Sequence, residues 1–379
     1  MLLCAKLVRL SVSAGVVFSA SGCEQQVNPA PARAVHSRQT RRPPAREPQV
    51  RFFGAPDGPD GVVFHRRAAT SVEQHTFPKD GGDFDPDVES SGRRLVFAST
   101  RHARVSHLYI KAVDGATVTQ VTDGNANDAQ PVFDPTGQRI AFSSDRSGNW
   151  DVWVIDVDGR NATQITNSPM QELHPSWSPD GKQLVYCRIS PRDIRGELWV
   201  AELDNPGVRK LIGEGLFPAW SPKGNRIAFQ RARARGSRWY SIWTVEYEDG
   251  EPRFPTEVGS RHDAALISPA WSPDGLQITF TAVMASDSTS VRDNGRGGGT
   301  HGGSRVGIVD ADGRGLQFLT EGKGAHYSPT WASDGRIYFT ERLDKTETIW
   351  SIRPFRPPLS DYPGKNVDDI TKDSNSVDE

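Results

Sequence analysis

The sequence contains few of the features that indicate a disulfide scaffold, a nucleic-acid binder or a membrane span. Its 379 residues include only three cysteines, Cys4, Cys23 and Cys187, which is too few for a disulfide framework. The formal net charge is −2, so the chain has no general attraction for nucleic acid and we expect no such partner. No apolar run reaches the roughly 18 residues that a membrane-spanning helix needs.

Familiar catalytic motifs are also missing. The sequence has no Gly-x-Ser-x-Gly elbow, no His-Glu-x-x-His pair and no cysteine pair, and this argues strongly against a serine hydrolase. The Gly-rich stretch 291–304 lacks the Lys-Ser/Thr ending of a phosphate-binding loop, so we expect an ordinary surface loop there. The basic segment Arg231–Arg238 is expected to be a solvated hairpin tip rather than a nucleic-acid site.

What the sequence does contain is a repeat, which is clearest in the stretch Pro175–Tyr186 with its Ser-Pro-Asp-Gly turn. The repeat occurs six times, and its glycines are Gly92, Gly137, Gly181, Gly224, Gly275 and Gly335. Their separations are 45, 44, 43, 51 and 60 residues, a spacing typical of propeller blades built from short strands. The sequence therefore predicts an all-β chain that folds as a six-bladed β-propeller of four-stranded blades.

Eight of the ten tryptophans fall at two equivalent positions of the repeat. They are Trp177, Trp220, Trp271 and Trp331, and then Trp153, Trp199, Trp243 and Trp350. Because large aromatic side chains dominate apolar burial in such cores, we expect them to pack between neighbouring blades and not to bind a ligand. We likewise expect Cys187 to be a small buried apolar residue.

One outer strand is left over when the strands are assigned to blades. A Gln-x-Thr strand occurs at Gln74–Thr76, before the first blade, and a similar one at Asp369–Thr371, after the last. One of the two must complete blade 6, and an N-terminal strand in that place would leave no open edge. We therefore expect the segment Val72–Phe77 to close the ring as a clasp.

The first 22 residues have the pattern of an export signal. Lys6 and Arg9 precede a short apolar run. The signal ends in Ala20-Ser-Gly-Cys23, which resembles the bacterial lipobox and implies a lipid on Cys23; an ordinary secretory signal with an incidental cysteine is the alternative. We expect a signal peptide at 1–22, a lipidated Pro- and Arg-rich tether at 23–60, the propeller at 61–372 and a disordered tail at 373–379. The protein would then be exported and anchored by its lipid to the membrane, on the periplasmic or outer-membrane side of a bacterial envelope.

The segment Phe142–Gly159, followed by Gln164–Thr166 and Pro175–Gly181, resembles the TolB-type propeller repeat. The resemblance extends over all six blades and implies a six-bladed propeller. The namesake of the family is a periplasmic part of the Tol–Pal system, and its propeller binds the peptidoglycan-associated lipoprotein at its mouth. TolB itself carries an α/β domain before the propeller, and the stretch after Cys23 is too short to supply one. The resemblance is therefore to a lipoprotein variant without that domain.

The positions that differ from blade to blade are the candidates for a site. The residue three before each repeat proline should begin the innermost strand and face the central channel. These residues are Asp83, Asp128, Glu172, Gly215, Leu266 and His326. The four polar ones, joined by His174 and Asp85 just before their prolines, would form a mostly anionic arc at one mouth of the channel.

Three interpretations of this arc are open. Asp83, Asp128, Glu172 and His326 could hold a hard divalent cation such as calcium or manganese, because carboxylate oxygens suit both ions. The mouth could instead accept a cationic side chain of a partner. The third interpretation is that the carboxylates are structural and bond only to water or to backbone amides.

Two functions follow from these interpretations. The first is a monomeric, non-enzymatic envelope lipoprotein whose propeller mouth binds an envelope protein or a cell-wall component, as the family resemblance implies. The alternative is a metal-assisted lyase or hydrolase that acts on a glycan in the channel. The lyase propellers that share this repeat use several histidines around the channel, whereas this chain offers only His326 and His174 there.

Overall fold

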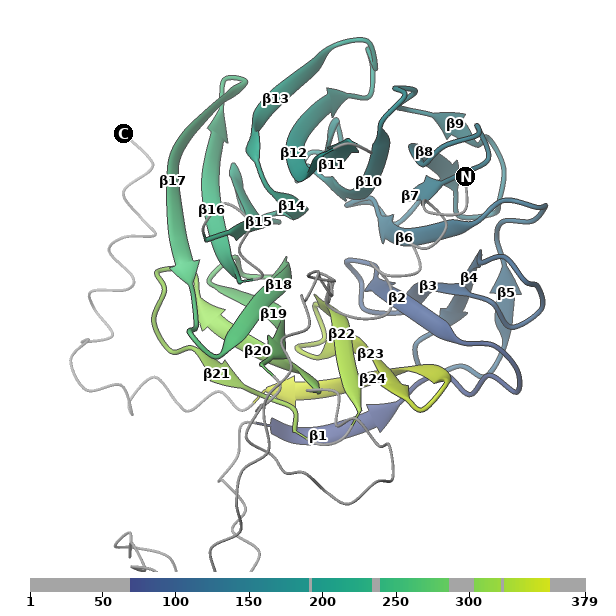
Figure 1. The fold of residues 1–379 in the computed structure, drawn as a ribbon. Helices are drawn as coiled ribbons and strands as arrows, with labels where there is room; N and C mark the ends of the chain where they lie inside the picture. Colours follow the sequence, from purple (N-terminus) through teal and green to yellow (C-terminus); the bar gives the residue numbers. More distant parts are fainter. Residues whose placement is uncertain (1–68, 191–192, 234–238, 286–302, 322–323, 355–379) are drawn as a thin grey trace, which may run out of the picture. The chain divides into compact units, whose positions relative to one another are not determined.

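Strands make up all the regular structure of the computed structural model, which describes residues 69–190, 193–233, 239–285, 303–321 and 324–354. These residues form 24 strands and no helix, arranged as six antiparallel sheets of four strands each (Figure 1). All of them belong to one compact unit, and a second unit at 17–66 lies outside the described residues. The prediction of an all-β, six-bladed propeller is therefore confirmed.

Each blade runs from an innermost strand outwards, in the order of the chain for blades 1 to 5. Blade 1 contains β2 (Asp83–Val88), β3 (Arg94–Ser99), β4 (His107–Ala112) and β5 (Val118–Gln120). Blade 2 contains β6 (Asp128–Phe133), β7 (Arg139–Ser144), β8 (Asp151–Asp156) and β9 (Thr163–Gln164). Blade 3 contains β10 (Gln171–Trp177), β11 (Gln183–Ser190), β12 (Asp193–Glu202) and β13 (Arg209–Glu214).

The remaining three blades follow the same plan, except that blade 6 takes its outer strand from the N-terminal side of the chain. Blade 4 contains β14 (Leu216–Trp220), β15 (Arg226–Ala232), β16 (Tyr240–Glu248) and β17 (Glu251–Gly259). Blade 5 contains β18 (Ala264–Trp271), β19 (Gln277–Met284), β20 (Ser304–Asp310) and β21 (Gln317–Phe318). Blade 6 contains β22 (Ala325–Trp331), β23 (Ile337–Leu343), β24 (Thr346–Pro354) and β1 (Ala69–Gln74).

The six innermost strands surround the centre of the ring (Figure 1). Each of β2, β6, β10, β14, β18 and β22 contacts the innermost strand of the next blade. Because the strands alternate in direction, the Ser-Pro-Asp-Gly turns lie on one side of the propeller, here called the turn face. The connections between blades, and those from the second to the third strand of each blade, lie on the other side, here called the loop face.

The hydrophobic core consists of six clusters of buried side chains, one at each junction between neighbouring blades. Four tryptophans of the first repeat position are buried in these clusters, as predicted. They are Trp177, Trp220, Trp271 and Trp331. The tryptophans of the second position are only half-buried against the same clusters. A guanidinium covers the ring of three of them, Trp153, Trp199 and Trp243.

The turn that marks each repeat is held by its own side chains. In blade 3 the Ser178 hydroxyl donates to the Asp180 carboxylate and accepts the amide of Gln183. Gly181 has a φ of 69°, a conformation that glycine adopts without steric cost. The Ser-Pro-Asp-Gly sequence thus fixes the register of the first two strands of a blade.

The ring is closed by β1, which pairs with β24 so that Val72 lies opposite Ile352 and Gln74 opposite Trp350. The segment that was predicted as the clasp is thus confirmed in this role, although the strand begins a few residues earlier. The Thr76 hydroxyl also accepts the Ile349 amide at 3.0 Å. Closure in this way leaves blade 6 with four strands and joins the two ends of the propeller.

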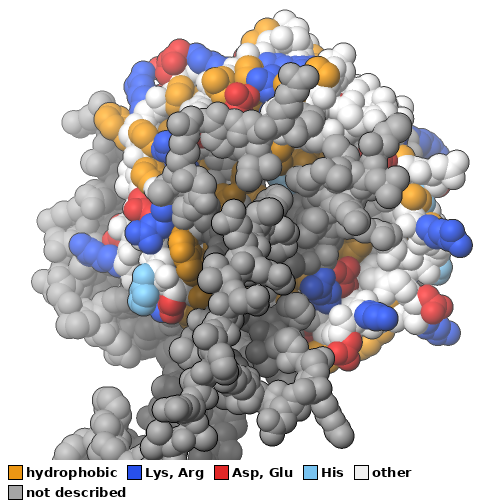
Figure 2. Space-filling view, viewed as in Figure 1, with side chains coloured by type: hydrophobic (Ala, Val, Ile, Leu, Met, Phe, Trp, Pro, Cys, Tyr) orange, Lys and Arg blue, Asp and Glu red, His pale blue; other side chains and the backbone are white. Residues whose placement is uncertain are grey.

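Several expectations concern residues outside the described part of the chain. The signal peptide, Cys23, the tether at 23–60 and the tail at 373–379 all lie there, as does Asp369–Thr371. Among the described residues no helix is long and apolar enough to cross a membrane. Cys187 is buried and has a free thiol, as expected. Figure 2 shows acidic and basic side chains interspersed around the rim of the drawn face.

Candidate functional site

Asp83 and Asp128, two of the predicted site residues, are fully buried within their own blades. Asp83 accepts hydrogen bonds from the Ser99 hydroxyl at 2.6 Å and from the Arg101 guanidinium at 2.6 and 3.2 Å. Asp128 accepts a 2.9 Å bond from Arg146. The same acid–arginine pair therefore occurs in blades 1 and 2, and it neutralises two of the predicted anionic residues.

Glu172 is also fully buried, at the junction of blades 2 and 3. One of its oxygens accepts the Ser168 amide at 3.2 Å, and the other lies 3.9 Å from the Arg209 guanidinium. It lies beside Asp151, whose pKa is raised to about 6 by burial and by the neighbouring Glu172 charge. Burial and the Glu172 charge together therefore disfavour the ionised form of Asp151.

His326 lies in blade 6, where its ring nitrogen is 3.2 Å from the Glu341 carboxylate. The two residues are opposite each other in the ladder of β22 and β23. The structure thus places Asp83, Asp128, Glu172 and His326 each with a partner of its own. Among the described residues no three side chains of His, Cys, Asp or Glu are grouped closely enough to hold a metal ion, so these four do not fit a shared cation site.

Another set of six residues lies two positions further along, directly before the repeat prolines, and several of its members contact one another. All six have a positive φ of 49° to 56° although none is glycine. They are Asp85, Gln130, His174, Phe217, Ser268 and Ser328, and we call them the pre-proline ring. Each sits where the pairing between the first two strands of its blade shifts register.

This backbone conformation is costly. A residue before proline is normally extended, and positive φ is uncommon for residues other than glycine, although Asn, Asp and His adopt it more often than the rest. Holding such a residue costs about 1–3 kcal/mol, and strain of this kind clusters at functional sites. Six strained positions at the centre of one ring therefore mark it as a candidate site.

Blades 6 and 1 meet in the ring through a hydrogen bond from the Ser328 hydroxyl to Asp85 Oδ1 at 2.7 Å. The other oxygen, Oδ2, is buried and has no hydrogen-bond partner among the residues that the structure describes. Burial raises the pKa of Asp85 to about 6, and the nearby Glu347 charge adds to this. Asp87, two residues on, also has its pKa raised to about 6 by burial. This side of the ring thus offers an unsatisfied acceptor whose charge depends on pH near neutrality.

Blades 2, 3 and 4 meet in the ring through Gln130, His174 and Phe217. The Gln130 amide oxygen accepts the backbone N–H of His174 at 3.0 Å, and its nitrogen lies 3.1 Å from the His174 ring. The centre of that ring is 3.7 Å from the centre of the Phe217 ring. Burial lowers the pKa of His174 to about 3, so the imidazole is neutral and this side of the ring is aromatic.

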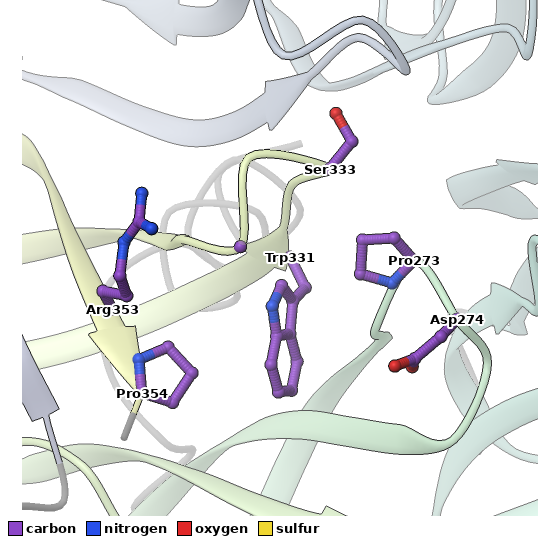
Figure 3. Close-up of a pocket in the computed structure, with 7 residues that line it drawn as sticks. Pro273, Asp274, Trp331, Ser333, Arg353 and Pro354 are labelled. Carbon is purple, nitrogen blue, oxygen red and sulfur yellow. The ribbon is translucent and has the colours of Figure 1, made fainter. Parts of the chain in front are cut away.

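Two cavities lie away from the pre-proline ring. One, of about 370 Å³, is on the turn face between blades 5 and 6. In Figure 3 the Trp331 indole lies between Pro354 on one side and Pro273 and Asp274 on the other. A second, of about 320 Å³, lies beside the clasp and is lined in part by Arg101 and the buried Lys111. None of the predicted site residues lines either cavity.

Sequence reasoning included His174 and Asp85 but missed the other members of the ring. Gln130, Phe217, Ser268 and Ser328 carry no charge, so the charge pattern of the sequence does not distinguish them. The available signal was the proline itself, because the residue before it must adopt a special conformation wherever the innermost strand bends.

Comparison with known proteins shows which family and which relatives this propeller resembles. Residues 149–290 match the model of the PD40 family, described as the TolB beta propeller domain. The propeller is TolB-like. A stretch of 113 residues is 33% identical to the Tol-Pal system protein TolB of Roseobacter denitrificans, and covers 28% of this chain and 23% of that protein. The match therefore spans about a quarter of the length of this relative.

Solved structures agree with the TolB-like fold. A structure assigned as TolB from Agrobacterium tumefaciens has a TM-score of 0.53 at 22% identity, covering 76% of this chain and 97% of that one. Oligogalacturonate lyase from Vibrio parahaemolyticus has a TM-score of 0.51 at 12% identity, covering 76% and 94%. At such identities both similarities show the fold alone, and TolB shares that fold with a lyase.

Proposed function

We propose that this TolB-like protein is a non-enzymatic protein of the bacterial cell envelope, and that its pre-proline ring binds a protein or cell-wall partner. The family match and the name of the Roseobacter relative, a Tol-Pal system protein, support a role of this kind. The proposal locates binding at the pre-proline ring, where polar side chains of blades 6 and 1 meet on one side and Gln130, His174 and Phe217 of blades 2, 3 and 4 meet on the other.

Phe217 is the observation that carries the proposal. A bulky side chain with a φ of 52° is a clear exception to the rule that such residues avoid this region. Its ring is only half-buried and lies against His174. A strained, partly exposed aromatic beside a neutral imidazole is well suited to receive an apolar or aromatic group of a partner.

The opposite side of the ring would supply polar recognition. Within the described part of the chain Asp85 Oδ2 has no hydrogen-bond partner, and leaving a buried acceptor unsatisfied costs about 1–3 kcal/mol. Because Oδ2 is itself buried, a donor on the partner, either an N–H or a hydroxyl, would recover that energy only when binding opens a path to this oxygen. The ring therefore combines an aromatic anchor with one hydrogen-bond acceptor, the usual composition of a small recognition site.

We further propose that the chain is exported as a monomeric lipoprotein. In this proposal residues 1–22 are the signal peptide, Cys23 carries the lipid, residues 23–60 form the tether and residues 61–372 form the propeller. The lipobox-like Ala20-Ser-Gly-Cys23 supports this organisation. The tether would hold the propeller near the periplasmic or outer-membrane side of the envelope.

The test is an affinity pull-down from a detergent extract of bacterial envelopes, followed by mass spectrometry. Wild-type protein is compared with Phe217→Asn, because asparagine tolerates positive φ and should keep the fold. Phe254→Asn is the matched control, since Phe254 also has a positive φ, of 51°, but lies 72% exposed on the outer strand β17.

We expect a specific envelope component that wild type and Phe254→Asn retain and Phe217→Asn loses. Equal recovery by all three proteins would contradict binding at the ring. If the wild-type protein retains no envelope component that resin without bound protein does not also retain, the proposal that this protein binds an envelope partner is contradicted. No specific observation in the described residues favours the glycan-cleaving alternative.

A further inference from the structure

The loop face of blade 4 carries two arginines at positions where other blades form acid–arginine pairs. In blades 1 and 2 the acid that begins the innermost strand binds an arginine 18 residues later, Asp83 with Arg101 and Asp128 with Arg146. In blade 4 the equivalent pair of positions is held by Gly215 and Arg233. The arginine is thus present, and the acid is missing.

Packing explains why blade 4 cannot hold that acid. A Cβ atom at Gly215 would lie 2.5 Å from Phe229 Cδ2 and 2.9 Å from Leu198 Cδ1. The space that the aspartate occupies in blades 1 and 2 is therefore filled by apolar side chains. As a result Arg233 makes no ion pair with a carboxylate in the described part of blade 4, and its Nη1 donates a 3.3 Å hydrogen bond to the Arg261 carbonyl.

Arg231, two residues earlier, also lacks the acidic partner that the equivalent residue of blade 3 has. In blade 3 the equivalent residue is Arg188, which binds Glu197 on the next strand at 2.7 Å. In blade 4 the residue opposite Arg231 is Ser241. The Arg231 guanidinium carbon lies 5.2 Å from the centre of the Trp243 ring, an arrangement that orients the guanidinium plane. Within the described chain neither Arg231 nor Arg233 makes an ion pair with a carboxylate.

We propose that Arg231 and Arg233 together bind carboxylates of an acidic peptide segment of a protein partner. The choice of ligand rests on the chain itself, because the equivalent guanidiniums of Arg101, Arg146 and Arg188 bind carboxylates of this protein. Arginine favours planar, two-pronged recognition of such groups. The site lies on the loop face of blade 4 and not at the pre-proline ring, so it goes beyond the function proposed above.

The affinity of the full chain for a fluorescent oligoglutamate peptide, measured by fluorescence anisotropy, tests this site. We expect wild type to bind it, more weakly as salt is raised, and not to bind an oligoglutamine peptide. In the double variant R231A/R233A the affinity should fall about tenfold or more, because two charge-assisted contacts are lost. The control R160A/R314A removes two well-exposed arginines and should bind like wild type.

Lysine variants keep the experiment decisive if the alanine variant fails to fold. R231K/R233K keeps both charges but not the two-pronged geometry, and we expect its affinity to be several-fold lower than that of wild type. Unchanged affinity in R231A/R233A would overturn the proposal. So would binding to anionic phospholipid vesicles or to inorganic phosphate without binding to oligoglutamate. A partner that is lost with Phe217→Asn but retained by R231A/R233A, with oligoglutamate binding unchanged, would refute this site and leave the proposed function standing.

Discussion

The carboxylate of Asp83 and the guanidinium of Arg101 form an ion pair of 2.6 Å in which the carboxylate is fully buried. The guanidinium also lies over the rings of Phe97 and Tyr109. The positive charge of Arg101 is therefore placed between the Asp83 carboxylate and two aromatic rings of blade 1. Asp128 and Arg146 repeat this arrangement in blade 2. These acids were read from the sequence as site residues, and the structure gives them a stabilising contact within each blade.

The first prediction concerns the removal of this acid. Asp83→Asn should lower the free energy of unfolding by about 3–5 kcal/mol, because it leaves a guanidinium largely buried without its counter-ion. Urea unfolding followed by tryptophan fluorescence would measure the loss. Asp123→Asn is the control, since Asp123 is exposed and its replacement should change stability by less than about 0.5 kcal/mol. Equal stability of the two variants would refute the structural role.

The second prediction concerns pH and Asp85. The folded-state pKa of Asp85 is about 6 and its ordinary value is 3.8, so the folded protein holds a proton that the unfolded chain has already released. The charged form in the fold is thus costly: the cost is absent below about pH 4, grows between pH 4 and 6, and is complete above pH 6. The difference between the two pKa values corresponds to a loss of at most about 3 kcal/mol in the free energy of unfolding.

Asp85→Asn removes this charge and keeps an acceptor for Ser328. The variant should therefore be more stable than wild type at pH 7.5, and the gain should disappear as the pH falls to 4. Urea unfolding at a series of pH values gives the curve, and Asp123→Asn, a change at an exposed site, is the comparison. A gain that grows toward low pH would show that burial does not control the Asp85 charge.

The architecture was predictable because it rests on local chemistry that repeats. The Ser-Pro-Asp-Gly turn, with glycine at a positive φ as at Gly181, is determined by turn residues alone. Blade 5 shows how far such a pattern tolerates exceptions. Its third strand has Gly307 where most blades have an aromatic, and the Phe280 ring fills the place, 2.6 Å from where a Cβ would be. The sequence showed the missing aromatic but not its replacement.

The candidate site was harder to predict because it depends on the direction in which each side chain of an innermost strand points. A register shift between Phe84 and Asp87 changes which side chains of β2 reach the ring centre, and spacing alone does not reveal it. The sequence also does not show which side chains form ion pairs. Asp83 is predicted as an unpaired acid, and only the fold shows that Arg101 binds it. In blade 4 the fold places Gly215 where that acid would stand, so Arg233 lacks the partner that Arg101 has.

The third prediction concerns the lipid. If Cys23 is acylated, cells grown with labelled palmitate should incorporate label into the wild-type protein and not into Cys23→Ser. The serine variant should also leave the membrane fraction when cells are fractionated, because its anchor is lost. Cys187→Ser is the control for cysteine loss, since Cys187 is fully buried. Equal labelling of wild type and Cys23→Ser would show that the lipobox resemblance is incidental.

The fourth prediction tests the clasp through one hydroxyl. The threonine that follows the outer strand of a blade accepts a backbone amide of the third strand: Thr166 accepts Val152 at 2.8 Å, and Thr76 accepts Ile349 at 3.0 Å. The isosteric change Thr76→Val leaves a buried N–H without a partner, which should cost about 1–3 kcal/mol.

Thr166→Val makes the same change in blade 2 and should cost a similar amount in urea unfolding. The two variants should differ in hydrogen exchange. Thr76 holds the joint between the two ends of the ring, so Thr76→Val should speed exchange in β1 and β24 through local opening. Thr166→Val, inside a blade that is continuous in sequence, should leave β1 and β24 as protected as in wild type. Faster exchange in β1 and β24 in both variants, or in neither, would mean that the ring does not open at the clasp.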